Sequence, residues 1–161
     1  MAERSDPVAE RPRMPKGYGV PETADGLMAW SDVRPVIEAT KIYWIASVRP
    51  EGKPHVIPIW GAWVDDVYYF EGGSDTRWGR NLQANRAMVV HLEQGNLAVM
   101  IEGRYEVVDL DQATCDAVND QYARKYAPYK PEGNCSGWHS MRPSAAFAWE
   151  KFPGDATRFR F

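Results

Sequence analysis

The stretch YWIASVRPEGKPHVIPIWGAWVDDVYYF, residues 43–70, decides the fold class. Apolar, β-branched and aromatic residues fill 42–48 and 55–64. The segment RPEGK between them has the glycine and proline of a turn, so the two runs predict a β-hairpin. Asp65-Asp66 predicts a second tight turn before the apolar run VYYF. The stretch therefore predicts consecutive strands that pair antiparallel.

The remaining sequence extends this pattern over one domain. Further strands are predicted at 86–93, 97–108, 145–152 and 157–161, a turn at 94–96, and short helices at 31–40 (with Ser31 as N-cap), 76–84 and 111–127. About six strands in sequential hairpins, with short helical insertions, predict a mainly β fold, an antiparallel barrel of six strands. Residues 1–25, rich in proline and charge, predict an extended N-terminal arm, and 26–161 predict the folded domain.

Composition narrows the function classes. The chain has 161 residues, 44% of them hydrophobic and 25% charged, with a net charge of −3, which argues against a nucleic-acid surface. The longest apolar run, 57–64, is far shorter than the roughly 20 residues of a membrane helix, and 1–13 have no apolar core of a secretory signal. Cys115 and Cys135 do not make a disulfide framework. We therefore expect a reduced, cytoplasmic protein that binds neither nucleic acid nor membrane.

The segment GGSDTRWGRNL, residues 72–82, is typical of an anion site. Residues 74–76 are all good N-cap types, and the first turn of a helix has free N–H groups and partial positive charge. Arg77 and Arg80 lie three apart on one helix face, where each can form paired hydrogen bonds with a phosphate. The alternative is a capped surface helix whose arginines are solvated or pair with Asp75 and Glu71.

The strand GKPHVIPIWG, residues 52–61, has an unusual composition. Pro54 and Pro58 remove backbone donors, and Gly61 marks a bulge or a close approach of two backbones. Such a strand leaves backbone groups available to a flat heterocycle that bonds along its edge. The alternative is a plain edge strand.

Together, the strand–turn–strand unit, the segment SDTRWGRNLQANRAMVVHLE and the strand VMIEGRYEVV resemble the pyridoxamine-phosphate-oxidase-like split-barrel flavoproteins. Members of that family bind FMN or the deazaflavin coenzyme F420. The resemblance covers about residues 26–161. It implies a six-stranded antiparallel split barrel and a homodimer with its cofactor in a groove between subunits. It also implies an oxidoreductase that transfers a hydride between the cofactor and an unidentified small molecule.

The resemblance also implies a set of cofactor-binding residues. The isoalloxazine ring is expected against His55, Val56, Ile57 and Pro58, and the phosphate at Ser74, Thr76, Arg77 and Arg80, with Asn81 behind them. Many relatives have lysine at the position of Trp78, which is expected either to stack on a ring or to pack across the subunit interface. FMN is favoured over coenzyme F420, because its single phosphate suits two arginines and two hydroxyls.

Other readings of the sequence stay open. A non-catalytic module that binds or sequesters flavin or haem is the alternative function, since no residue is identified as a catalytic acid or base. His55 is a proton-donor candidate or a polar strand residue, and His91 is expected to be half-buried. Cys135 and His139 have the spacing of half a metal site, but a structural zinc site needs four ligands, so no metal is predicted.

Overall fold

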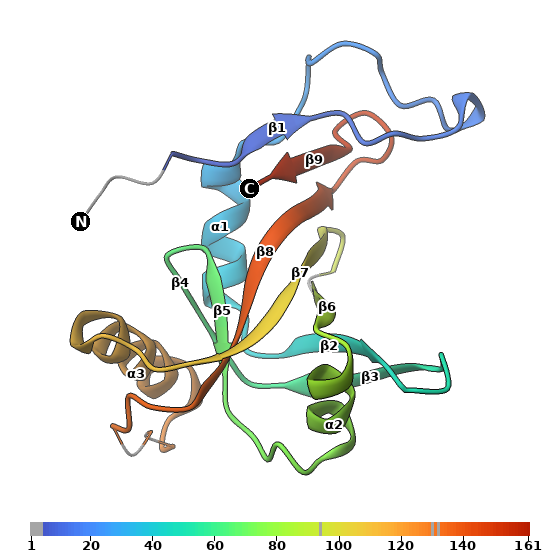
Figure 1. Ribbon diagram of the computed structural model, residues 1–161. Coiled ribbons are helices and arrows are strands. Elements are labelled where there is room, and N and C mark those ends of the chain that lie inside the picture. The colour runs from blue at the N-terminus through green and yellow to red at the C-terminus, as the bar shows by residue number, and fades with distance from the viewer. Residues whose placement is uncertain (1–4, 94, 130, 132) are drawn as a thin grey trace.

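The computed structural model describes residues 5–93, 95–129, 131 and 133–161, and its described part contains nine strands and three α-helices (Figure 1). The strands are β1 (Val8–Glu10), β2 (Tyr43–Val48), β3 (Pro54–Ile59), β4 (Ala62–Val64), β5 (Val67–Phe70), β6 (Ala87–Leu92), β7 (Ala98–Val108), β8 (Trp138–Trp149) and β9 (Thr157–Arg160). The α-helices are α1 (Trp30–Ala39), α2 (Arg77–Ala84) and α3 (Gln112–Tyr126), and a short 3-10 helix covers Lys16–Tyr18.

All the strands pair antiparallel, in the order β1-β9-β8-β7-β6-β2-β3, and β5 joins β4 to β8. The long strand β8 pairs with β7 along its length and with β5 and β9 at its two ends, so the sheet branches there and does not close. The predicted mainly β, antiparallel split-barrel class is confirmed. The described residues contain nine strands rather than about six. Beyond the seven strand segments predicted one by one, the arm contributes β1, and the predicted strand 55–64 divides into β3 and β4.

The division between β3 and β4 has a steric cause at Gly61. A Cβ atom at this position would overlap the ring of Tyr68 on β5, so only glycine fits here. The close approach at Gly61 is therefore made by a side-chain ring, and not by the second backbone that was predicted. The turn at Asp65 and Asp66 is confirmed, since both residues have left-handed backbones, with φ of 51° and 55°.

Two of the three helix starts agree with the sequence prediction. The Thr76 hydroxyl accepts the Gly79 N–H at 3.2 Å at the start of α2, and the Asp111 carboxylate accepts the Thr114 N–H at 2.8 Å at the start of α3. The N-cap predicted at Ser31 is wrong, because α1 already begins at Trp30 and no side chain caps it. Helix α1 is stabilised by burial of its apolar face, which includes Trp30, Val33 and Ile37, rather than by a capping hydrogen bond.

The N-terminal arm is fastened to the end of the chain. Strand β1 pairs with β9, and the Arg11 guanidinium donates to the carbonyl oxygens of Gly154 and Ala156, each at 3.0 Å. The arm therefore shares the sheet of the domain, and the division at residues 25 and 26 stays a prediction. Residues 1–4 of the arm and Gln94 of the predicted turn lie outside the described residues.

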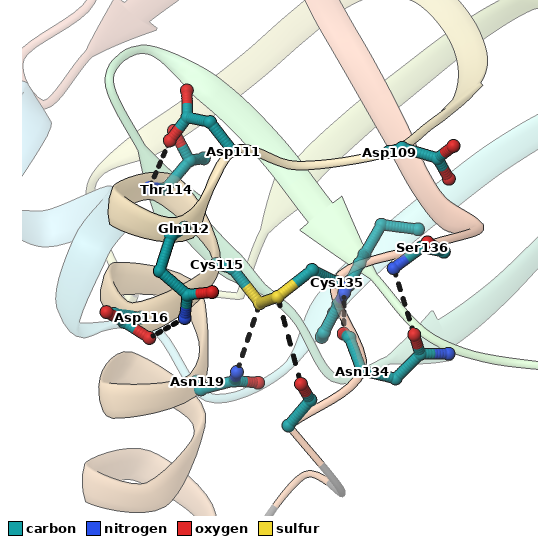
Figure 2. Close-up of a disulfide and its surroundings, with 12 residues drawn as sticks. Asp109, Asp111, Gln112, Thr114, Cys115, Asp116, Asn119, Asn134, Cys135 and Ser136 are labelled. Atoms are coloured by element: carbon teal, nitrogen blue, oxygen red, sulfur yellow. Dashed lines mark hydrogen bonds between the residues drawn. A yellow bond between two sulfur atoms is a disulfide. The ribbon is translucent and has the colours of Figure 1, made fainter.

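The two cysteines form a disulfide, so the prediction of reduced thiols is wrong. Cys115 on α3 is joined to Cys135 in the segment before β8, 20 residues further along the chain, with 5.4 Å between the Cα atoms (Figure 2). The sequence contained no sign that α3 and this segment lie together. Within the described residues, no helix is long and apolar enough to cross a membrane.

Helix α3 is anchored to β4 by the Gln121 side chain, which forms hydrogen bonds with the strand backbone as a neighbouring strand would. The Gln121 amide accepts the Trp63 N–H at 2.6 Å and donates to the Trp63 carbonyl at 2.9 Å. Around this pair, Tyr122 and Tyr126 of α3 pack with Trp138 in a small buried cluster that is separate from the main core. The C-terminal end of α3 is thereby held next to the segment that links β3 to β4.

Candidate functional site

Strand β3 lies at the end of the sheet order, and no strand in the described part of the chain pairs with its outer edge. In its register with β2, His55 lies opposite Ser47 and Ile57 lies opposite Ile45. Side chains directly opposite each other share a face, so His55 and Ile57 point toward the core side of the sheet and are half-buried. The alternating residues Val56 and Pro58 point to the other face and are exposed.

Helix α2 covers the face of the sheet to which His55 points. The buried Asn81 donates through its side-chain nitrogen to the Ser47 hydroxyl at 3.1 Å, and Ser47 is the β2 partner of His55. This hydrogen bond holds α2 against β2, and β2 in turn pairs with β3, which lies within the segment 52–61 identified in the sequence. Figure 1 shows α2 beside β2.

Arg77 and Arg80 are exposed at the start of α2. The three ion pairs found among the described residues involve neither of them, and the one hydrogen bond found there for these two guanidinium groups runs from Arg80 to the Asp75 carbonyl at 2.7 Å. The alternative in which the arginines pair with the carboxylates of Asp75 or Glu71 is therefore not what the structure contains. Their positive charge is available to an anion in solution.

Trp78 lies inside the subunit. Its side chain is 5% exposed and packs on Phe70 and His139, with ring centroids 5.3 and 5.0 Å away. Of the two roles considered for Trp78, packing agrees with this position, although the contacts are within the subunit rather than across an interface. The remaining predicted residues, Ser74 and Thr76, lie on the loop just before α2, where Ser74 is exposed and Thr76 half-buried.

His139 supports this loop, a role that the sequence did not reveal. Its Nε2 donates to the Gly72 carbonyl at 3.0 Å, so the Nδ1 of the neutral ring accepts the Tyr105 hydroxyl at 2.7 Å. Burial lowers the pKa of His139, which favours this neutral form. Because β8 was predicted to begin only at residue 145, His139 was placed in a loop and considered only as half of a metal site. No group of three or more metal-ligating side chains occurs within the described residues.

Arg49 is a second residue that sequence reasoning missed. It follows β2 two residues after Ser47, and its Nε is buried without a hydrogen-bond partner in the described structure. The side-chain oxygen of Asn81 is also buried and unpartnered. Buried polar atoms without partners are uncommon and often point to an absent ligand or water. With the free N–H groups of the first turn of α2 and the guanidinium groups of Arg77 and Arg80, the Arg49 donor fits the phosphate end of a cofactor. The Asn81 oxygen is an acceptor, so it needs a donor rather than a phosphate.

A substitution at Gly79 tests whether the loop before α2 is held tightly. A Cβ atom there would lie 2.7 Å from the carbonyl carbon of Ser74, which is backbone and cannot rotate away. Helix propensity alone would favour Gly79→Ala by about 1 kcal/mol. We expect the opposite sign, a loss of roughly 1–3 kcal/mol, measured by urea unfolding.

Gly17→Ala is the matched control, because no atom lies within 4 Å of a Cβ built at Gly17. Its free energy of unfolding is expected to stay within about 0.5 kcal/mol of the wild type. A stabilising Gly79→Ala would mean that the loop at residues 72–76 moves easily, and that it does not present a preformed anion site.

Comparison with known proteins gives a family match over most of the chain. The family model described as pyridoxamine 5'-phosphate oxidase matches residues 30–150. This range contains β2 to β8, and so includes both segments of the candidate site. No curated protein is similar enough in sequence to be matched.

Solved structures with the same fold include proteins that are named for different roles. A conserved hypothetical protein from Mycobacterium tuberculosis is 20% identical, with a TM-score of 0.65, over 80% of this chain and 88% of that one. A protein named F420 reductase is 25% identical, with a TM-score of 0.53, over 70% and 94%. A heme binding protein from Mycobacterium smegmatis is 16% identical, with a TM-score of 0.63, over 80% and 56%.

Proposed function

The chain belongs to the pyridoxamine 5'-phosphate oxidase family, and on that premise we propose that it is a flavin- or deazaflavin-dependent oxidoreductase. The observation that carries the proposal is the hydrogen bond between Asn81 and Ser47. It holds α2 against β2, the strand that pairs with β3. Two surfaces that suit the two ends of such a cofactor, the uncovered strand β3 and the arginine-bearing start of α2, therefore lie on neighbouring elements. The similarity to the protein named F420 reductase supports the cofactor class.

The start of α2 would hold the phosphate. Arg77 and Arg80 supply charge-assisted donors, and the first turn supplies backbone N–H groups. The Thr76 oxygen accepts the Gly79 N–H, so its own hydroxyl proton remains for a phosphate oxygen, and the Ser74 hydroxyl is a further donor. His139 keeps the loop in place through Gly72.

Strand β3 would hold the ring through the residues His55, Val56, Ile57 and Pro58. Its outer edge has backbone groups that no strand in the described structure uses. Pro58 has no backbone N–H, so it offers only its carbonyl to a bound ring. Bound flavin or deazaflavin supplies hydride-transfer chemistry, and the chain supplies orientation and hydrogen bonds. No described side chain is assigned as a catalytic acid or base.

Between the two cofactors, FMN is favoured, with coenzyme F420 as the alternative. A single terminal phosphate matches two arginines, two hydroxyls and one helix start. The longer acidic tail of the deazaflavin needs additional basic groups along its path.

A non-catalytic module that binds flavin or haem is the second candidate function. The absence of an assigned acid or base at β3 favours it, and the fold itself does not discriminate, because a heme binding protein shares it.

Turnover distinguishes the enzyme from the module. We expect bound FMN or coenzyme F420, reduced anaerobically, to be reoxidised by small-molecule acceptors faster than the free cofactor, because β3 leaves one side of the ring open. Stopped-flow absorbance with quinones, enones and dioxygen measures these rates. If every acceptor reacts at the rate of the free cofactor, the oxidoreductase proposal fails and the binding module is favoured.

We also propose a homodimer, since the uncovered edge of β3 and the exposed side chain of Val56 need a covering surface. Sedimentation is expected to give a mass twice 18.3 kDa at micromolar concentration. A cofactor-loaded protein that stays monomeric would rule this out. A cytoplasmic location stays a prediction, and the disulfide weighs against it, because such bonds are rare in that compartment.

A further inference from the structure

A second candidate site lies at the end of β3, outside the residues assigned to the cofactor. A groove of about 620 Å³ runs between this strand end and the C-terminal end of α3. Trp60, the residue directly after β3, is 45% exposed there and stacks on Tyr126, with ring centroids 4.6 Å apart and planes 8° from parallel. Tyr129 stands at 60° to the Trp60 ring at 5.9 Å. These rings form an exposed stacking platform for a flat ligand.

A buried amine lies beside this platform. The Lys125 side chain lines the groove, and the residue is 9% exposed. Its Nζ donates to the Tyr43 hydroxyl at 2.8 Å and to the Gly61 carbonyl at 2.9 Å. An ammonium group has three protons, and no described residue accepts the third or forms an ion pair with Lys125. A buried charge without a counter-ion is costly, so a ligand that supplies one is favoured.

The charges around the groove have one sign. Two of the described residues that line it are lysines, Lys41 and Lys125, and none of them is acidic. Two carboxylates lie outside the lining: that of Glu71 accepts the Tyr129 hydroxyl at 2.8 Å, and that of Glu38 on α1 opposes the lowering of the Lys125 pKa without forming an ion pair with it. The groove therefore combines a ring-stacking surface with positive charge, and it suits an anion better than a cation.

We propose that this groove binds a planar aromatic anion, with its ring against Trp60 and its anionic oxygen on Lys125. Trp60 is two residues from Pro58, where the cofactor ring is expected, so the bound anion would lie next to that ring. We take this anion to be the substrate, and that step rests on the proposed oxidoreductase function. Binding of the anion in the groove does not depend on that function.

Calorimetric titration of the full-length protein with 2-naphthoate, without a hydride donor, tests the proposal. We expect saturable binding to the wild type and at least tenfold weaker binding to Trp60→Ala and to Lys125→Met. Trp60→Phe keeps a ring and is expected to stay within about threefold. Trp149→Ala is the matched control, because Trp149 at the end of β8 packs on Phe152, is not part of the groove lining, and is expected to leave binding unchanged.

Two ligand analogues separate charge from stacking. The neutral 2-naphthamide is expected to bind more weakly than 2-naphthoate to the wild type and equally to Lys125→Met. The proposal is overturned if 2-naphthoate binds Trp60→Ala and Lys125→Met as it binds the wild type, or if saturating FMN displaces it, since the groove would then belong to the cofactor. Failure of turnover with normal 2-naphthoate binding would instead refute only the oxidoreductase proposal.

Discussion

The double variant Arg77→Ala, Arg80→Ala is expected to bind FMN roughly a hundredfold more weakly than the wild type, or worse. Each arginine would lose a charge-assisted hydrogen bond worth about 1.5–3 kcal/mol, and each 1.4 kcal/mol is tenfold in affinity. Neither side chain takes part in an ion pair among the described residues, and both are exposed. The melting temperature without ligand is therefore expected to stay the same.

Titrations with FMN, riboflavin and coenzyme F420 make this prediction specific. Riboflavin has no phosphate, so its affinity should hardly change in the double variant. With saturating FMN the wild type should gain thermal stability by mass action, and the double variant should not. Arg13→Ala removes an exposed arginine from the arm and is the matched control for charge. Equal losses of riboflavin and FMN affinity would mean that these arginines do not bind phosphate.

The elements that the sequence predicted well depend on local signals. The hairpin at 43–59, the turn at Asp65-Asp66 and the helix starts near Thr76 and Asp111 each follow from a few neighbouring residues. The position of α2 beside β2 was not predicted, because the family resemblance only assigned the strand 55–58 and the helix start to one cofactor. Its physical basis, the bond from Asn81 to Ser47, joins residues 34 positions apart.

The features that the sequence did not reveal depend on distant partners. The first half of β8 contains Pro143 and many polar residues, and it becomes a strand because β7 and β5 pair with it on its two sides. His139 gains its role from that pairing. The disulfide forms where the segment before β8 lies next to the start of α3, with the Leu110 N–H donating to the Cys135 carbonyl at 2.7 Å, and no spacing of the two cysteines predicts this contact. Lys125 appeared as one more charge on a helix, and only its bonds to Tyr43 and Gly61 show that it is buried.

Replacing Lys125 with methionine is expected to stabilise the protein, and to do so more at pH 6 than at pH 9. Burial lowers the pKa of Lys125 from 10.5 to about 7, with Glu38 of α1 opposing the shift and Arg124 of α3 adding to it. Below pH 7 both the folded and unfolded states are protonated, and the folded state bears the full cost of the buried charge. Above pH 7 the folded state releases the proton while the unfolded state keeps it, so this cost falls as pH rises toward 10.5.

The stability gap between Lys125→Met and the wild type should therefore shrink by roughly 2–3 kcal/mol from pH 6 to pH 9, at about 1.4 kcal/mol per pH unit above 7. Methionine leaves no neighbour unpaired, because the Tyr43 hydroxyl still donates to Ile37 and the Gly61 carbonyl still accepts from Tyr126. Urea unfolding at several pH values gives the gap, since titrating groups that do not interact with Lys125 cancel between the two proteins. Glu38 is the exception, because Lys125 lowers its pKa. Lys41→Met, at an exposed lysine of the same groove, is the matched control for the loss of one positive charge. A gap for Lys125→Met that is constant with pH would mean that Lys125 stays protonated in the folded protein, and that the groove already contains its counter-ion.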